Sequence, residues 1–117
     1  MAKVIFVLRR RPGLTREQAT EQWSGERHLS HVRKLPGLVR FVQNHVVAAP
    51  GAPGEPVCDG VGELWFESDE AMERALGSPE MGAAVESAKG FLDMEKTGMI
   101  IVAEKTMIEA APAGSQR

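Results

Sequence analysis

The sequence predicts an α+β domain of the ferredoxin-like type, with a four-stranded antiparallel sheet and helices on one face. Apolar runs of strand length occur at four places, and helix-start signals follow the first and third runs. The resulting order is β-α-β-β-α-β. The length of 117 residues suits one domain. We expect residues 1–109 to form it, and residues 110–117, which are mostly small or polar, to be a disordered tail.

The N-terminal sequence predicts the first strand and the first helix. Residues 3–10 begin with an apolar run typical of a strand covered on both faces, and a Pro-Gly pair follows it. The first helix is expected over residues 15–35. Thr15 and Gln18 have the spacing of a capping box, and Gly25 is a weak point inside the helix. A second Pro-Gly pair ends this helix.

The middle strands are predicted over residues 38–47 and 57–66, joined by a loop rich in proline and glycine. Two short helices follow, with Ser68 as the N-cap of one and Ser78 before the other. The last strand is predicted over residues 99–108. The apolar residues of the last two strands exceed what one layer of helices covers. We therefore expect a C2 homodimer that pairs through the bare sheet faces.

Composition and charge narrow the range of partners. The chain has 14 Lys and Arg against 16 Asp and Glu, which argues against nucleic acid as the main partner. Cys58 is the only cysteine, so no disulfide can form within the chain, as is typical of a cytoplasmic protein. The apolar run at the N-terminus is too short for a signal peptide or a membrane span. No phosphate loop, dinucleotide-binding glycine run or zinc pattern occurs, and we expect no cofactor.

Two segments of the sequence resemble the EthD family. Residues 28–45 join a helix histidine to Pro-Gly-Leu, and residues 59–66 end in Glu-Leu-Trp-Phe. With Trp23 upstream and Glu104 in the last strand, the resemblance covers about residues 3–108. It implies a dimeric α+β barrel with a pocket between the sheet and the helices of each subunit. A distant relative, methylmuconolactone methylisomerase, is similar in the first segment and rearranges a lactone without a cofactor.

His28 is the first candidate for catalysis. The resemblance places the relative's important histidine at this position, eight residues before the proline. An imidazole titrates near neutral pH, so it can take up and return a proton. Helical spacing puts His28 near Val32 and Leu35, toward the sheet, and a core histidine bonded to backbone is the alternative. The relative's strand tyrosine corresponds to Phe41, so a role that depends on a phenol hydroxyl does not carry over.

Three further residues are candidates for catalysis. Asn44 and His45 point to opposite faces of their strand, so one is expected to line the pocket, where it would hold a carbonyl or enolate oxygen. The sequence leaves open which one. Glu63 is expected to be partly buried with a raised pKa, and to pair with His28 or Arg40. An inter-subunit salt bridge and ordinary polar groups of a sheet are the alternatives.

The expected binding residues are mostly aromatic. They would shape a dry pocket and stack on a flat ligand, and they are Trp23, His31, Phe41, Trp65 and Phe66. Core packing is the alternative for the aromatic residues, and a place at the helix surface is the alternative for His31. The pair of His28 and His31 lacks the further ligands that a metal site requires, so we expect no metal.

Three functions fit these residues. The first, which we favour, is a cofactor-free lyase or isomerase in which His28 moves a proton on a small aromatic, lactone or polyketide-like molecule. The second is a cofactor-independent oxidoreductase or monooxygenase, in which an activated substrate reacts with oxygen. The third is a non-catalytic dimer that binds a ligand or assists an oxygenase pathway. The sequence does not fix the substrate.

Overall fold

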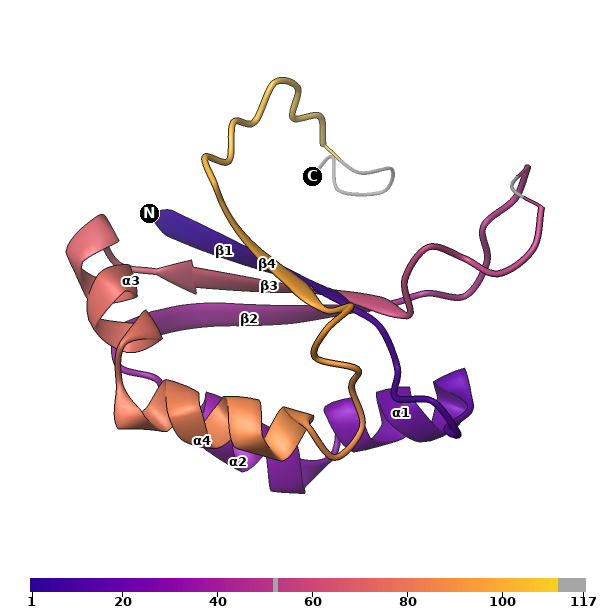
Figure 1. Ribbon diagram of the computed structural model, residues 1–117. Helices are drawn as coiled ribbons and strands as arrows, with labels where there is room; N and C mark the ends of the chain where they lie inside the picture. The colour runs from indigo at the N-terminus through magenta and orange to yellow at the C-terminus, as the bar shows by residue number, and fades with distance from the viewer. Residues whose placement is uncertain (52, 112–117) are drawn as a thin grey trace.

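The computed structural model of the protein describes residues 1–51 and 53–111, and Figure 1 shows how its helices and strands are arranged. In chain order the elements are β1 (Ala2–Leu8), α1 (Arg16–Trp23), α2 (Glu26–Val32), β2 (Leu38–His45), β3 (Gly60–Phe66), α3 (Asp69–Leu76), α4 (Pro79–Ala88) and β4 (Gly98–Val102). The strands pair in the order β2-β3-β1-β4, and every pair is antiparallel. Helices α1, α2 and α4 lie on one side of the sheet (Figure 1). The predicted ferredoxin-like α+β fold is confirmed.

The helices begin where their capping residues predict. The Thr15 hydroxyl accepts a hydrogen bond from the Gln18 backbone N–H at 3.1 Å, and the Gln18 side chain accepts one from the Thr15 N–H at 2.9 Å. Ser68 and Ser78 accept bonds in the same way at the starts of α3 and α4. Each cap satisfies an N–H group that has no partner within its helix, so these start positions are fixed locally.

The first helical segment is two helices, and the prediction of one helix over residues 15–35 is wrong in this respect. Gly25 is extended, with φ −75° and ψ 152°, and becomes the N-cap of α2. A Cβ at this position would lie 3.2 Å from the Glu21 carbonyl oxygen, which is a tight contact. The glycine therefore lets the chain turn between α1 and α2 without a clash.

The first three strands are shorter than predicted. β1 ends at Leu8 instead of residue 10, β2 ends at His45 instead of residue 47, and β3 begins at Gly60 instead of residue 57. The reason is the pairing of the strands, because Gly60 is the first residue of β3 that pairs with either neighbour, and it lies opposite Leu8 and His45.

The last strand is also shorter than predicted. β4 ends at Val102, opposite Lys3, since its neighbour β1 begins only one residue further on at Ala2. Residues 103–111 leave the sheet on the side away from the helices (Figure 1). The expected disordered tail lies outside the described residues from position 112 onward.

The turn between α2 and β2 depends on glycine at position 37. Gly37 has φ +74°, a conformation that L side chains rarely adopt, and a Cβ there would lie 2.9 Å from the Ala71 Cβ. The turn thus brings the start of β2 close against α3. This contact and the positive φ are the structural reason for the glycine in the Pro-Gly-Leu sequence.

Apolar side chains lie on both faces of the sheet. The face toward the helices carries Val4, Phe6 and Leu8 of β1, which belong to the apolar core. On the opposite face, hereafter the open face, Val7 lies across from Val61, and Ile5 from Ile100.

Among the described residues, no helix is both long and apolar enough to cross a membrane.

Candidate active site

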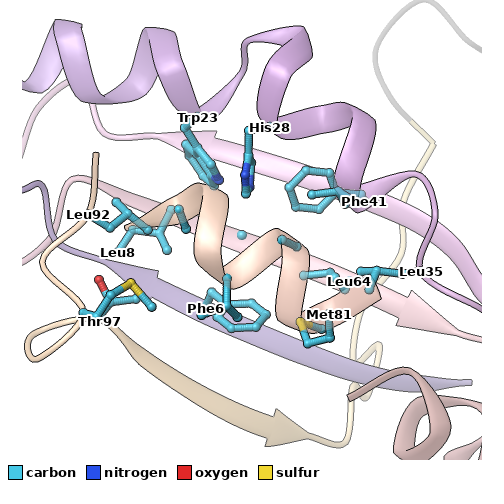
Figure 2. Close-up of a pocket in the computed structure, with 16 residues that line it drawn as sticks. Phe6, Leu8, Trp23, His28, Leu35, Phe41, Leu64, Met81, Leu92 and Thr97 are labelled. Carbon is cyan, nitrogen blue, oxygen red and sulfur yellow. The ribbon is translucent and has the colours of Figure 1, made fainter. Parts of the chain in front are cut away.

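A small apolar cavity lies between the sheet and helices α2 and α4, and Figure 2 shows the residues around it. Its volume is about 70 Å³. Phe6 and Leu64 form part of its floor on the sheet, and Met81 and Leu92 approach from the segment that contains α4. No charged side chain lines the cavity among the described residues. Polar atoms at the wall come from His28, Thr97 and the indole of Trp23.

His28 is buried at the wall of this cavity, and the residue is 7 % exposed. Figure 2 shows its ring pointing from the helix into the space between Trp23 and Phe41. The inward orientation predicted from the helical spacing with Val32 and Leu35 is therefore correct. The role of His28 in catalysis stays a prediction at this point.

The two ring nitrogens of His28 have different surroundings. Nδ1 lies 3.2 Å from the Ser87 hydroxyl oxygen. Nε2, at the far end of a ring that points into the cavity, makes no hydrogen bond to the described residues (Figure 2). Burial, with a smaller contribution from nearby His31, lowers the pKa of His28 to about 4. The imidazole is therefore neutral at pH 7, with one nitrogen held and the other free.

Trp23, the last residue of α1, forms the neighbouring part of the wall. Its indole lies against two glycines of β3, since a Cβ on Gly60 would lie 2.7 Å from Cζ3 and a Cβ on Gly62 would lie 3.3 Å from Cζ2. Gly62 lines the cavity and Gly60 does not. The side of the indole that carries Nε1 is next to Cζ2, so this N–H is on the cavity side. It donates to no described residue.

Asn44 and Glu63 lie on the open face, away from the cavity. The Asn44 amide donates to Glu63 Oε2 at 2.8 Å, and the Lys3 ammonium lies 2.7 Å from Glu63 Oε1. Hydrogen bonds from Lys3 and then from Asn44 lower the pKa of Glu63. The expected raised pKa and the pairing with His28 are therefore wrong. The strand register is the reason, because it places Glu63 opposite Ile5 and Val42 rather than beneath the helices.

His45 is on the helix side of β2, which answers the question that the sequence left open. Its ring stacks on Trp23 with centroids 5.0 Å apart, and its Nε2 lies 2.9 Å from the Gln43 side-chain oxygen. His45 is exposed, however, and does not line the cavity. The structure thus brings neither Asn44 nor His45 to the position expected for an oxyanion donor.

The expected binding residues separate into two groups. Trp23 and Phe41 line the cavity. Phe66 is fully buried in the core, His31 is half-buried on α2, and Trp65 lies on the open face beneath the Lys3 ammonium, which is 4.3 Å from its ring centre. None of these three lines the cavity, so the expectation that they shape it is wrong. Strand alternation decides this for Trp65, because its neighbours in β3 face the helices.

Two polar residues near the cavity were missed by the sequence interpretation. Ser87 contacts His28, and the Thr97 hydroxyl accepts a hydrogen bond from the Arg9 N–H at 3.2 Å. Ser87 comes three residues after Ala84 in α4, which is the spacing of a buried helix face. A serine on this apolar face is a signal that identifies Ser87 as a candidate. Thr97 lies in a loop and has no comparable signal.

A second, larger hollow lies on the outside of the helical layer. This outer cleft has a volume of about 640 Å³ and carries mainly polar side chains, including Gln22, Glu26 and Glu86. His28 borders both the inner cavity and the outer cleft, and Ser87 borders the cleft. Among residues 1–51 and 53–111, no three His, Cys, Asp or Glu side chains gather where they could share a metal ion.

The fold and this site define a class of small ferredoxin-like α+β proteins that hold a helix histidine above an apolar cavity. The sequence pattern of the EthD domain matches residues 11–95, which is more than half of the chain. The chain therefore belongs to the EthD family. No curated protein sequence matches it.

Solved structures share the fold at low sequence identity. An EthD family protein from Bacillus halodurans has a TM-score of 0.71 and 23 % identity, with 90 % of this chain and 100 % of that chain covered. The cofactor-independent oxygenase SnoaB from Streptomyces nogalater has a TM-score of 0.57 and 16 % identity, with 93 % and 100 % covered. A dimeric ferredoxin-like protein from Thermobifida fusca has a TM-score of 0.58 and 17 % identity, with 88 % and 90 % covered.

Proposed function

We propose that this EthD family protein is a cofactor-independent enzyme of the lyase or isomerase type, in which His28 takes up and returns a proton next to a carbonyl group. The observation that carries the proposal is a buried, neutral imidazole with a free nitrogen at the wall of an apolar cavity. A neutral imidazole is the form that accepts a proton. Because no charged side chain lines the cavity among the described residues, an uncharged aromatic, lactone or polyketide-like group fits it best.

The size of the cavity limits the ligand in this conformation. Its volume of about 70 Å³ is small beside the roughly 300–1,000 Å³ typical of ligand pockets. A bound ligand is therefore small, or it displaces lining side chains. Met81 and Met94 line the cavity, and methionine side chains change conformation easily. We propose that these two residues move to admit an aromatic or lactone ring.

The proposed chemistry uses His28 and Trp23. Nε2 of His28 removes a proton from the carbon next to the carbonyl group, and the Trp23 N–H donates a hydrogen bond to the carbonyl oxygen as negative charge builds up. In an isomerase, His28 returns the proton to another carbon. In a lyase, the electron pair expels a leaving group, which receives the proton. Trp23 thus takes the role that was predicted for Asn44 or His45.

Deuterium incorporation tests this proposal with a panel of model compounds in place of the natural substrate. The protein is incubated in deuterium oxide with small aromatic ketones and lactones, and NMR follows the loss of hydrogen next to the carbonyl group. We expect incorporation into at least one compound, and His28→Gln should slow it by about 100-fold or more. Arg33→Gln, at the exposed end of the same helix, is the matched control. Equal rates in His28→Gln and the native protein would exclude His28 from the chemistry.

A cofactor-independent oxygenase is the second candidate. The similarity to the cofactor-independent oxygenase SnoaB favours it, although this similarity concerns the fold. Oxygen consumption that depends on an added substrate would support this candidate over the lyase or isomerase. A third candidate, a binding or accessory dimer, is favoured by the few polar groups in the cavity. Ligand binding without deuterium incorporation or oxygen uptake would support it.

The proposal includes a homodimer that pairs through the open face. Structural neighbours include dimeric ferredoxin-like proteins, and the open face carries apolar residues such as Val7, Val61 and Ile100. Pairing would remove this surface from water. Met107 and Ile108 are 83 % and 89 % exposed in the segment that leaves β4, so a partner subunit is their natural contact. The lone Cys58 agrees with a cytoplasmic location.

A further inference from the structure

The imidazole of His28 lies between two spaces of opposite character. On one side is the apolar inner cavity, and on the other is the outer cleft with its polar side chains. The ring therefore forms part of the wall between the proposed reaction site and the outer cleft. Deuterium incorporation requires that the proton on His28 exchange with water before His28 returns it to the ligand. The contacts of His28 indicate a route by which this proton can reach water.

Ser87 lies next to His28 and also borders the outer cleft. Its hydroxyl lies 3.2 Å from Nδ1, and the residue lines the cleft. A hydroxyl is both a donor and an acceptor. It therefore satisfies Nδ1 in either form of the ring, whether Nδ1 carries the proton or Nε2 does. A carboxylate in this place would accept only, and an apolar side chain would leave Nδ1 without a partner.

Phe91 restricts the ring to one orientation. Its ring meets His28 edge to face, with centroids 5.2 Å apart and an angle of 83° between the planes. Phe91 is itself buried. A flip of the imidazole would put Cδ2 in the place of Nδ1 within this packing and would break the contact with Ser87. The proton therefore has a shorter route through Ser87 than by rotation of the ring.

We propose that Ser87 is a positioning residue and a proton relay that connects His28 with water in the outer cleft; this inference rests on the proposed function for its place in turnover. When Nε2 takes a proton from the ligand, Nδ1 gives its own proton to the Ser87 oxygen, and the Ser87 hydroxyl proton passes to a water molecule. The ring ends neutral, with its proton on Nε2. The reverse transfers reset it, so His28 exchanges protons with water on the side of the outer cleft.

A matched pair of variants tests the relay. Ser87→Thr keeps the hydroxyl, and Ser87→Val has nearly the same shape without it. NMR on the full-length protein labelled with nitrogen-15 measures the ring nitrogen shifts of His28 and the rate at which its ring proton exchanges with water. We expect the native rate in Ser87→Thr and a rate lower by about fivefold or more in Ser87→Val, the factor that corresponds to one typical hydrogen bond. The Ser87→Val ring shifts should also show a changed proton distribution between Nδ1 and Nε2.

Two further variants complete the experiment. Ser87→Ala repeats the loss of the hydroxyl with a good helix former, so the test holds even if the valine disturbs α4. Ser30→Ala is the control, since this serine on α2 bonds to the Arg27 carbonyl instead of His28. Native exchange rates in both Ser87→Val and Ser87→Ala would overturn the relay. Because exchange is measured without a substrate, the relay can fail while His28→Gln still abolishes deuterium incorporation, and the reverse also holds.

Discussion

The indole of Trp23 fills the space that a side chain at position 60 would need. A Cβ on Gly60 would lie 2.7 Å from Cζ3 and 3.1 Å from Cη2 of Trp23, and 3.3 Å from the Asn44 carbonyl oxygen. The indole cannot retreat easily, because Trp23 is buried and stacks on His45. The glycine of β3 and the tryptophan of α1 therefore fix the distance between the sheet and this end of the helical layer.

Gly60→Ala should destabilise the fold because the new methyl group and the indole cannot both be accommodated. We expect a loss of about 1–3 kcal/mol in the free energy of unfolding, as for other overpacked cores. Urea denaturation measures it. Gly98→Ala is the control, since it makes the same change in β4, where a Cβ meets no atom within 4 Å. Equal effects in the two variants would contradict steric conflict at Gly60.

Trp23→Phe should impair the proposed reaction more than the fold. Phenylalanine keeps an aromatic ring against β3 but removes the N–H that we expect to face the carbonyl oxygen. Loss of one such donor typically slows the chemical step by about 100-fold or more. The deuterium incorporation assay measures the rate, and urea denaturation measures the stability of the variant. A native rate in Trp23→Phe would remove this N–H from the chemistry.

Asp59 links the start of β3 to the N-terminal half of the chain. It is 2 % exposed, and its carboxylate accepts hydrogen bonds from Arg10 Nη1 at 2.6 Å, from Arg16 Nε at 3.1 Å and from the Arg10 backbone N–H at 2.8 Å. Burial alone would raise the pKa of Asp59, but the hydrogen bonds from Arg10 and Arg16 together outweigh it and lower the pKa.

Asp59→Asn should cost about 3–5 kcal/mol, because it leaves two arginines without their buried partner. Glu55→Gln is the matched control. Glu55 contacts the same two arginines from a surface position with 58 % exposure, so its change should cost about 1 kcal/mol or less. Since the pKa of Asp59 is lowered by folding, its contribution is present above the unfolded pKa and is lost as the pH falls through the folded pKa. Urea denaturation across acidic pH measures this loss of stability. Equal losses of stability in Asp59→Asn and Glu55→Gln would contradict the larger contribution of Asp59.

The buried His28 should make the fold less stable at mildly acidic pH. Its pKa is about 4 in the folded chain, against about 6.5 in the unfolded chain. The unfolded chain therefore binds more protons in this window, and stability falls as the pH is lowered from about 6.5 toward 4. The loss is at most about 3 kcal/mol, and solvent screening reduces it because the ring borders the outer cleft.

Urea denaturation at about pH 7.5 and about pH 5 measures this loss. His28→Asn removes the titrating group, so the stability of this variant should change less between the two conditions than that of the native protein. A His31→Asn variant serves as the control, because His31 is only half-buried. An equal pH dependence in the native protein and in His28→Asn would show that His28 is charged in the folded state.

A charge on the open face should separate the proposed homodimer. Val61 lies there opposite Val7 and Asn44, so Val61→Glu would place a carboxylate inside the interface. Light scattering should show a dimer for the native protein and a monomer for this variant. Ala83→Glu, at an exposed position of α4, should remain a dimer. A dimeric Val61→Glu protein would show that the subunits pair through another surface.

Several features of the fold could be predicted because they depend on neighbours in the chain. Helix starts at Thr15, Ser68 and Ser78 use hydrogen bonds between residues three apart, and the turn at Gly37 uses a positive φ that glycine adopts readily. The order of strands and helices follows from these local signals. The inward face of His28 also follows, since helical spacing relates it to Val32.

The rest of the site depended on contacts between distant segments. The contact of His28 with Ser87 joins residues 59 positions apart, and no local pattern relates them. Strand register placed Asn44 and Glu63 on the open face, because a shift of one residue reverses every side chain of a strand. Local signals in the chain were thus enough to establish which elements form and where most of them begin. The folded arrangement decided which polar groups lie at the site. The physical reason is that caps and turns depend on a few neighbouring residues, while strand pairing and side-chain packing join residues that are far apart in the chain.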